Sequence, residues 1–472
     1  MKISHPLGVL ALLALALASG PARADKTTHE RHFAHYEGTK TCLQCHESEA
    51  REFHQSQHYQ WLGSGESLAN APRHPVGKMN MINDFCTNPD ASWIGQVKNA
   101  DGKVVASGCS GCHAGRGLKP TRKVSREQLE NIDCLICHAE GYRRGVVQDA
   151  KGAWEWRSIL WNNPEGLDSV AKRITTPTRV MCLRCHNSSG GGANIKRGDM
   201  DYTLAKPTRD FDVHMGTDGR DMACTNCHAE RAHRVIGRGV DLASNDSPGQ
   251  RLTCTGSCHP ATPHKSGKLN KHAERIECAT CHIPTFARDE PTEMSRDWSK
   301  VVFNTERGRY APTQVLEQNV RPVYAWYNGK SFMQLAREPV SLTDRGEIRS
   351  AVPMGSRTDP TAKIAPFKLH HGVMPVTADK RHWLLPIAVE DCFGAGNVDE
   401  AVRRAAQSFY GIDDLKYEWM PTVRYMTIAH GVQPSDKALD CDDCHGAGGR
   451  MDWRALGYDQ DPREAAKAGG TK

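Results

Sequence analysis

The sequence has little of what an ordinary globular domain uses to build its interior. Only 38% of its 472 residues are hydrophobic, 7% are aromatic, and the mean hydropathy is −0.59. A chain this polar does not offset its loss of conformational entropy by burying side chains alone. We therefore expect a further apolar component, such as a porphyrin, to supply part of the interior.

Long hydrophobic runs are also missing, apart from one apolar stretch over residues 7–18. This stretch follows the basic Lys2 and leads to small residues ending at Ala24, which is the pattern of a secretory signal peptide. It is too short to cross a bilayer. We expect cleavage after Ala24, no membrane span, and a mature protein in the periplasm.

Cysteine and histidine are abundant, with 18 and 23 residues respectively. Sixteen of the cysteines form eight pairs, and a histidine directly follows each pair. The pairs are Cys42 and Cys45, Cys109 and Cys112, Cys134 and Cys137, Cys182 and Cys185, Cys224 and Cys227, Cys254 and Cys258, Cys278 and Cys281, and Cys441 and Cys444. The histidines are His46, His113, His138, His186, His228, His259, His282 and His445.

This spacing is that of covalent haem attachment. Two thiols about one turn apart add to the two vinyl groups of a haem, and the next residue points its imidazole at the iron. Seven pairs have two intervening residues, whereas Cys254 and Cys258 have three, and we expect the extra residue to loop out. Zinc sites and disulfides do not require a histidine at this position, so the repeated pattern excludes them. The sequence predicts eight covalently bound haems c.

A low-spin haem needs a second axial ligand, which is usually histidine. Fourteen histidines outside the motifs remain after the predicted cleavage, more than a polar surface requires. The best candidates for distal ligands are His58, His214, His233, His264, His272, His382 and His430. His29, His32 and His35 belong to a polar mature terminus, from which one could also ligate. The long gap between His282 and His445 can supply ligands from His370, His371, His382 or His430.

The formal charge of +6 does not indicate a nucleic-acid or membrane partner. Loss of Lys2 and Arg23 with the signal peptide leaves +4, and each haem brings two propionates. The apparent basicity is therefore local compensation for the haem carboxylates.

The fold predicted from these patterns is mainly α and irregular, a multihaem cytochrome c fold with its core built around eight haems. After the signal peptide at 1–24, we expect a haem-rich region at 25–290 with seven motifs. A C-terminal region at 291–472 supplies helices, the eighth motif and distal ligands. Ser125 and Gln128 predict the start of a helix, and Asn397 to Gly411 predict another with caps at both ends. The stretch 286–360 is predicted to be an irregular wrap.

Several specific stretches resemble the tetrathionate reductase family of octahaem c-type cytochromes. They are residues 82–86, which end at Cys86, together with 109–115, 190–199, 212–215, 278–288 and 438–453. The resemblance covers most of the mature chain. It departs from the family pattern in the spacing between Cys86 and Cys109, in the sixth motif, and at Arg197, where histidine is common.

The resemblance implies a catalytic haem at the second motif, with His113 on one side and a lysine on the other. Lys196 matches that lysine best, and Lys172 is the alternative. It also implies a cysteine near this haem, which matches Cys86. The expected activity is reduction of tetrathionate, nitrite or hydroxylamine. Without the family resemblance, Lys196 could be a solvated lysine or form a salt bridge with a propionate, and Cys86 with Cys392 could instead form a disulfide.

Three functions remain open from the sequence. The first is a reductase of a small oxyanion, fed by a redox partner cytochrome or a quinol-oxidising membrane protein. The second is a pure electron carrier with eight six-coordinate haems. The third is a hydroxylamine-oxidising enzyme with a tyrosine cross-linked to haem, for which no motif marks Tyr410, Tyr417 or Tyr425.

Overall fold

A computed structural model of the chain describes residues 29–70, 73–84, 87–93, 96–98, 104–148, 150–151, 154–158, 166–187, 199–237, 246, 250 and 252–469. The predicted signal peptide lies outside these residues. None of the helices in the described ranges combines the length and the apolar character that a bilayer span requires.

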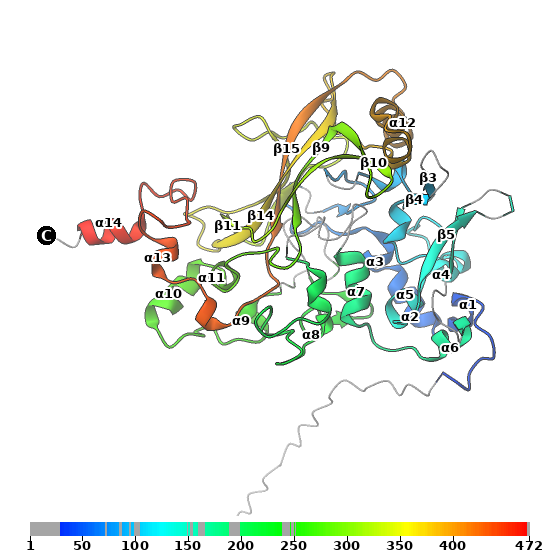
Figure 1. Ribbon diagram of the computed structural model, residues 1–472, viewed down its shortest axis with the longest axis horizontal. Coiled ribbons are helices and arrows are strands. Elements are labelled where there is room, and N and C mark those ends of the chain that lie inside the picture. Colours follow the sequence, from blue (N-terminus) through cyan, green and yellow to red (C-terminus); the bar gives the residue numbers. More distant parts are fainter. Residues whose placement is uncertain are drawn as a thin grey trace, which may run out of the picture.

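Short helices are the main regular elements of the first 290 residues, and they lie along one side of the molecule (Figure 1). Few of them exceed two turns, so they gain little stability from helix propagation alone. Their bounds are α1 Thr39–Cys42, α2 Glu47–His54, α3 Gln57–Gln60, α4 Arg126–Asn131, α5 Leu135–His138, α6 Gly166–Lys172, α7 Arg179–His186, α8 Cys224–Cys227, α9 Cys254–Ser257, α10 Gly267–Arg275 and α11 Cys278–His282. Single helical turns, η1 Pro89–Ala91, η2 Cys109–Gly111 and η3 Tyr202–Ala205, occur between them.

Two-stranded ribbons connect these helices. They are β1 Gly63–Ser64 with β2 Pro75–Val76, β3 Gln96–Lys98 with β4 Val104–Ser107, β5 Arg144–Gln148 with β6 Trp154–Ser158, and β7 Glu230–Arg231 with β8 Arg234–Val235. All four are antiparallel.

A seven-stranded sheet forms the other side of the molecule (Figure 1). Its strands are β9 Thr292–Asn304, β10 Arg309–Glu317, β11 Val323–Tyr327, β12 Ser331–Met333, β13 Ile348–Pro353, β14 Lys363–Thr377 and β15 Tyr417–Thr427. The order is β10-β9-β14-β15-β13-β12, and β11 pairs with β14. The β14–β15 pairing is antiparallel over eleven residues of each strand, from Phe367 to Thr377.

The largest apolar cluster lies between this sheet and α12 Val398–Tyr410, beside the short η4 helix Asp391–Ala395. Trp298 of β9 and Met374 of β14 pack there against Val402 and Ala405 of α12, and all four are fully buried. The remaining elements are η5 Ser435–Lys437, α13 Cys441–Cys444 and α14 Pro462–Gly469, which extends at one end of the molecule (Figure 1).

The predicted helix starts are confirmed, but the irregular wrap over 286–360 is wrong. The Ser125 hydroxyl accepts a hydrogen bond from the Gln128 amide at 3.1 Å. Asn397 caps α12, and Gly411 ends it with φ +70°. Five strands, β9 to β13, occupy the stretch that was expected to be irregular. Charged residues such as Arg296 lie on the buried side of these strands as ion pairs, and they hide the alternation by which a strand is recognised.

One short segment connects the sheet to the second cysteine motif. The Thr87 hydroxyl exchanges hydrogen bonds with the backbone of Ile387, each 2.7 Å long. A few residues later, the carbonyl of Ser92 accepts from the Cys109 amide, and that of Trp93 accepts from the Ser110 amide, both at 2.7 Å. The sheet region therefore fixes the position of the second motif.

Candidate functional site

Every cysteine motif includes or adjoins a short helical turn. In the first, third, fifth and eighth motifs the amide of the histidine donates to the carbonyl of the first cysteine over 2.8–3.1 Å. In the sixth motif His259 still donates to the Cys254 carbonyl at 2.9 Å, although one more residue intervenes. The backbone turn therefore accommodates the extra residue and keeps the histidine in the same relation to the first cysteine.

A continuous cavity of about 1960 Å³ runs along these turns. It is larger than the 300–1,000 Å³ typical of a site for one small molecule. Cysteines of the first seven motifs line it, together with the motif histidines His46, His138, His186, His228, His259 and His282. The cavity thus has the size and the lining expected for several large apolar groups held in a row.

Histidine rings occur in pairs, five of them along this channel, and each pair joins one motif histidine to one from outside the motifs. The distances between ring centres are 6.1 Å for His29 and His46, 6.1 Å for His58 and His186, 6.0 Å for His214 and His259, 6.0 Å for His228 and His430, 6.2 Å for His264 and His282, and 6.4 Å for His272 and His445. A bond from a metal to an imidazole nitrogen is about 2.1 Å, so two rings on opposite sides of one iron have centres roughly 6 Å apart. The six pairs therefore fit bis-histidine haem ligation.

Hydrogen bonds at Nδ1 orient several of these rings. Nδ1 of His228 lies 2.8 Å from the Ile236 carbonyl, and Nδ1 of its partner His430 lies 3.0 Å from Asp199. In another pair, Nδ1 of His272 bonds to Lys268 and Nδ1 of His445 bonds to Asp461. An imidazole that uses Nδ1 in this way presents Nε2 to a metal.

The third motif has its candidate partner in His233. The pKa of His138 is lowered chiefly by burial, and His233 is among the neighbouring groups that lower it further. His138 also places Nδ1 3.0 Å from the Thr175 carbonyl. His138 and His233 both line the channel, so His233 is the candidate partner of the third motif beside the six ring pairs.

The second motif differs from the others. His113 is fully buried, and its ring contacts are Tyr59 at 5.0 Å, Trp61 at 5.4 Å and Trp93 at 5.0 Å. Among the described residues no other histidine ring contacts it. Its Nε2 lies 2.6 Å from the Tyr59 carbonyl and faces that oxygen rather than the channel, although Cys112 lines the channel wall. Burial lowers the pKa of His113 to about 4, which keeps the ring neutral.

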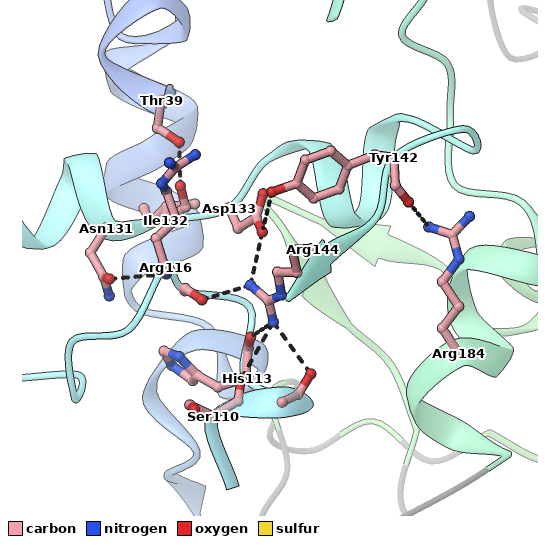
Figure 2. Close-up of polar contacts among 12 residues, drawn as sticks. Thr39, Ser110, His113, Arg116, Asn131, Ile132, Asp133, Tyr142, Arg144 and Arg184 are labelled. Carbon is pink, nitrogen blue, oxygen red and sulfur yellow. Dashed lines mark hydrogen bonds and ion pairs between the residues drawn. The ribbon is translucent and has the colours of Figure 1, made fainter. Parts of the chain in front are cut away.

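A buried arginine fastens the second motif to the third (Figure 2). Arg144 donates to the backbone carbonyls of Ser110 and His113, and it pairs with the Asp133 carboxylate at 2.8 Å. Asp133 directly precedes Cys134 of the third motif, and it also accepts a hydrogen bond from Tyr142 at 3.1 Å. The side chains of Arg144 and Asp133 are at most 5% exposed. Their buried ion pair therefore holds the two motifs rigidly together.

Some candidates from the sequence lie elsewhere. Lys196 and Cys86 fall outside the described residues. Lys172 lies 5.7 Å above the Phe33 ring and donates to the Ala34 carbonyl, apart from the second motif's aromatic contacts. His382 is in an exposed turn and makes no ring contact with a motif histidine in the described part of the chain. Cys392 is buried beside the sheet.

His370 lies in a buried ionic network of the sheet, where its Nε2 is 3.0 Å from Glu293. Its neighbour His371 faces Glu347 at 3.2 Å. His29, which the sequence marks only as part of a polar terminus, stacks on His46. His54, which no sequence pattern marks, is fully buried with its ring centre 5.2 Å from that of Tyr59. Only the fold could have identified these two, since neither lies in a recognisable motif.

The comparisons with known proteins agree with this picture. Residues 285–448 match a family model described as bacterial cytochrome c. The chain is 34% identical over 289 residues to an uncharacterized protein of Archaeoglobus fulgidus, covering 52% of this chain and 94% of that protein. An octahaem cytochrome c from Shewanella oneidensis has a similar crystal structure, with a TM-score of 0.72 and 31% identity over 90% of this chain and 94% of that one.

The fold and the channel define a multihaem c-type cytochrome, a redox protein that holds its haems c covalently. The chain belongs to the octahaem c-type cytochromes. The resemblance drawn from the sequence is thereby confirmed, and so is the multihaem fold, to which the structure adds the seven-stranded sheet.

Proposed function

We propose that this octahaem cytochrome is a reductase of tetrathionate, or of nitrite or hydroxylamine, that acts at the haem of the second motif. One observation carries the proposal. Six motif histidines lie 6.0–6.4 Å from a histidine outside the motifs, and the third motif shares the channel with its candidate partner His233, whereas His113 has no such neighbour among the described residues. A haem without a second histidine is the one whose open face admits a different ligand or a substrate.

In this proposal Lys196 would be the second residue that holds this haem, and its charge would favour an anionic substrate. Cys86 is a thiol suited to exchange with a polythionate sulfur. Arg144 holds the backbone of the second motif, and Tyr59, Trp61 and Trp93 exclude water from His113. When bound, the haems supply the electrons, while these side chains position the substrate and tune its surroundings.

The reactions balance as follows. Tetrathionate takes two electrons, its central S–S bond breaks, and two thiosulfates leave without a change in protons. Nitrite takes six electrons and eight protons to give ammonium and two waters. Hydroxylamine takes two electrons and three protons to give ammonium and one water.

Contacts between motif cysteines support a path by which electrons reach the second haem. Cysteines from different motifs are close neighbours in four pairs: Cys42 and Cys134, Cys112 and Cys185, Cys182 and Cys224, and Cys254 and Cys278. Cys137 also lies near Cys182, Cys227 near Cys258, and Cys281 near Cys444. The attachment points thus form one series from the first motif through the third to the eighth in order, and the second motif branches from the fourth. We infer that electrons entering anywhere along this series reach the second haem.

We further propose that residues 1–24 are a cleaved signal peptide, that the protein works in the periplasm, and that a cytochrome or a quinol-oxidising membrane protein reduces it. The proposed domain division, 25–290 and 291–472, separates the first seven motifs from the sheet and the eighth motif.

The direct test is reoxidation of the fully reduced protein by tetrathionate, nitrite and hydroxylamine, followed by the haem absorption. We expect at least one of them to oxidise it with turnover, and Lys196→Ala to slow that turnover by about a hundredfold or more. Lys172→Ala is the matched control and should leave the rate unchanged, since Lys172 lies on Phe33. If none of the three compounds oxidises the reduced protein, the reductase proposal is refuted.

A further inference from the structure

Lys78 projects from a turn that is fixed against the aromatic wall of the second motif. The turn follows β2, and the backbone of Gly77 packs so closely on Trp61 that a Cβ at Gly77 would meet the Trp61 carbonyl oxygen at 2.0 Å. Asn80 accepts the Gly77 amide at 3.0 Å, and the Asn88 amide group donates to the Lys78 carbonyl at 3.3 Å. The backbone of Lys78 is therefore held in place from both sides.

The side chain of Lys78 lies between this wall and the channel. Its Nζ is 5.0 Å from the centre of the Trp61 ring, within the range of a cation–π contact, and Trp61 in turn contacts the His113 ring. Lys78, Trp61 and Cys112 all line the channel, and Lys78 is the single lysine among its described lining residues. A fixed cation thus lies on the channel wall at the second motif.

We propose that Lys78 binds the anionic substrate of the reductase and selects for negative charge. This inference rests on the proposed function and adds a residue to the same site. A cation on an apolar wall attracts an anion more strongly than it does in water, and the contact with the Trp61 ring places the ammonium group at the channel wall. Lys78 takes no part in electron or proton transfer, so its contribution appears in binding rather than in the chemical step.

The substrates of the proposed reductase make a graded test, because tetrathionate is a dianion, nitrite is a monoanion, and hydroxylamine is neutral at pH 8. In the holoprotein, Lys78→Gln should raise KM for tetrathionate and nitrite by about tenfold or more, the size expected for the loss of one charge-assisted contact. The kcat should stay within about twofold, and KM for hydroxylamine should not change. Lys78→Arg should restore most of the affinity for the anions, and Lys172→Gln serves as the control lysine.

Equilibrium binding gives the same comparison without turnover. Nitrite titrated into the oxidised holoprotein by calorimetry should bind about tenfold or more weakly to Lys78→Gln than to the wild type, and the wild-type affinity should fall as salt is added. If Lys78→Gln lost as much affinity for hydroxylamine as for the anions, Lys78 would be a structural residue and the proposal would be overturned. Unchanged nitrite affinity in Lys78→Gln would also overturn it. A wild-type protein that binds nitrite through Lys78 but reduces none of the substrates would refute the reductase and leave the anion site standing.

Discussion

The sheet side and the channel side of this molecule differ in what fills their interiors. Around the sheet, a large apolar cluster packs α12 on β9 and β14, with residues such as Leu385 and Val402 completely buried. Along the channel the apolar clusters are small, the helices are short, and a cavity of about 1960 Å³ occupies the interior. The sheet side supplies its own interior, whereas the channel side needs its haems to have one.

Buried charge is also distributed differently. At the sheet, Asp84 pairs with Arg424 at 2.6 Å, Glu293 pairs with Arg296 at 2.8 Å, and His370 lies between the two carboxylates. All five side chains are at most 3% exposed. Along the channel the histidines are arranged as facing pairs instead. The same residue type thus completes an ionic network on one side and flanks a cofactor position on the other.

The largest expected effect comes from preventing haem attachment altogether. A chain produced without covalent haem should lose its structure over the channel side, because no side chains replace the missing interior. Limited proteolysis should then cut mainly within residues 29–290 and leave the sheet strands protected. Equal cleavage of both sides, or a channel side as resistant as in the holoprotein, would contradict the comparison.

The next largest effect is expected from Arg424→Met in the holoprotein. This change leaves the buried Asp84 carboxylate without its guanidinium, which should cost about 3–5 kcal/mol of unfolding free energy. Lys300→Met is the matched control on β9, where an exposed lysine pairs with Asp297, and it should cost at most about 1 kcal/mol. Chemical denaturation of both variants measures these changes. Equal losses of unfolding free energy would show that burial does not increase the contribution of the network to stability.

The network also predicts sensitivity to acid. Burial acts to raise the pKa of Glu293, but the Arg296 charge and the hydrogen bond to His370 outweigh it and hold the pKa at about 2. A depressed carboxyl pKa contributes stability above its unfolded value of about 4.3, and that stability is lost as the pH falls toward 2. We expect a loss of about 3 kcal/mol from this group across that interval. The unfolding free energy of Glu293→Gln, measured by denaturation at several pH values, should therefore depend less on pH than that of the wild type.

A smaller but more local effect is expected from Arg144→Met on the channel side. Tyr142 would still donate to Asp133, so the loss should be about 1–3 kcal/mol rather than that of a bare buried charge. The haem spectrum of the second motif should change more than those of the others. Arg143→Met is the control, because Arg143 is exposed and donates only to the carbonyls of Glu140 and Tyr142. If Arg143→Met changed the unfolding free energy and the haem spectrum as much as Arg144→Met does, Arg144 would have no special role in joining the two motifs.

The sequence predicted the parts that depend on local spacing. The cysteine motifs, the cofactor and the two capped helices follow from residues a few positions apart, such as Ser125 and Gln128. The histidine pairs could not be assigned in the same way, because His58 and His186 are brought together only by the fold. The sequence did not predict the sheet, because charged residues such as Lys368 and Arg424 are expected at the surface, and their buried partners are known only from the structure.

Ligand binding to the oxidised holoprotein tests the central claim most directly, namely that seven haems have two histidine ligands and the second does not. Cyanide titrated at neutral pH, and followed by electron paramagnetic resonance, should convert one haem signal per chain and leave seven bis-histidine signals intact. Eight unchanged bis-histidine signals, or cyanide binding at several haems, would contradict it.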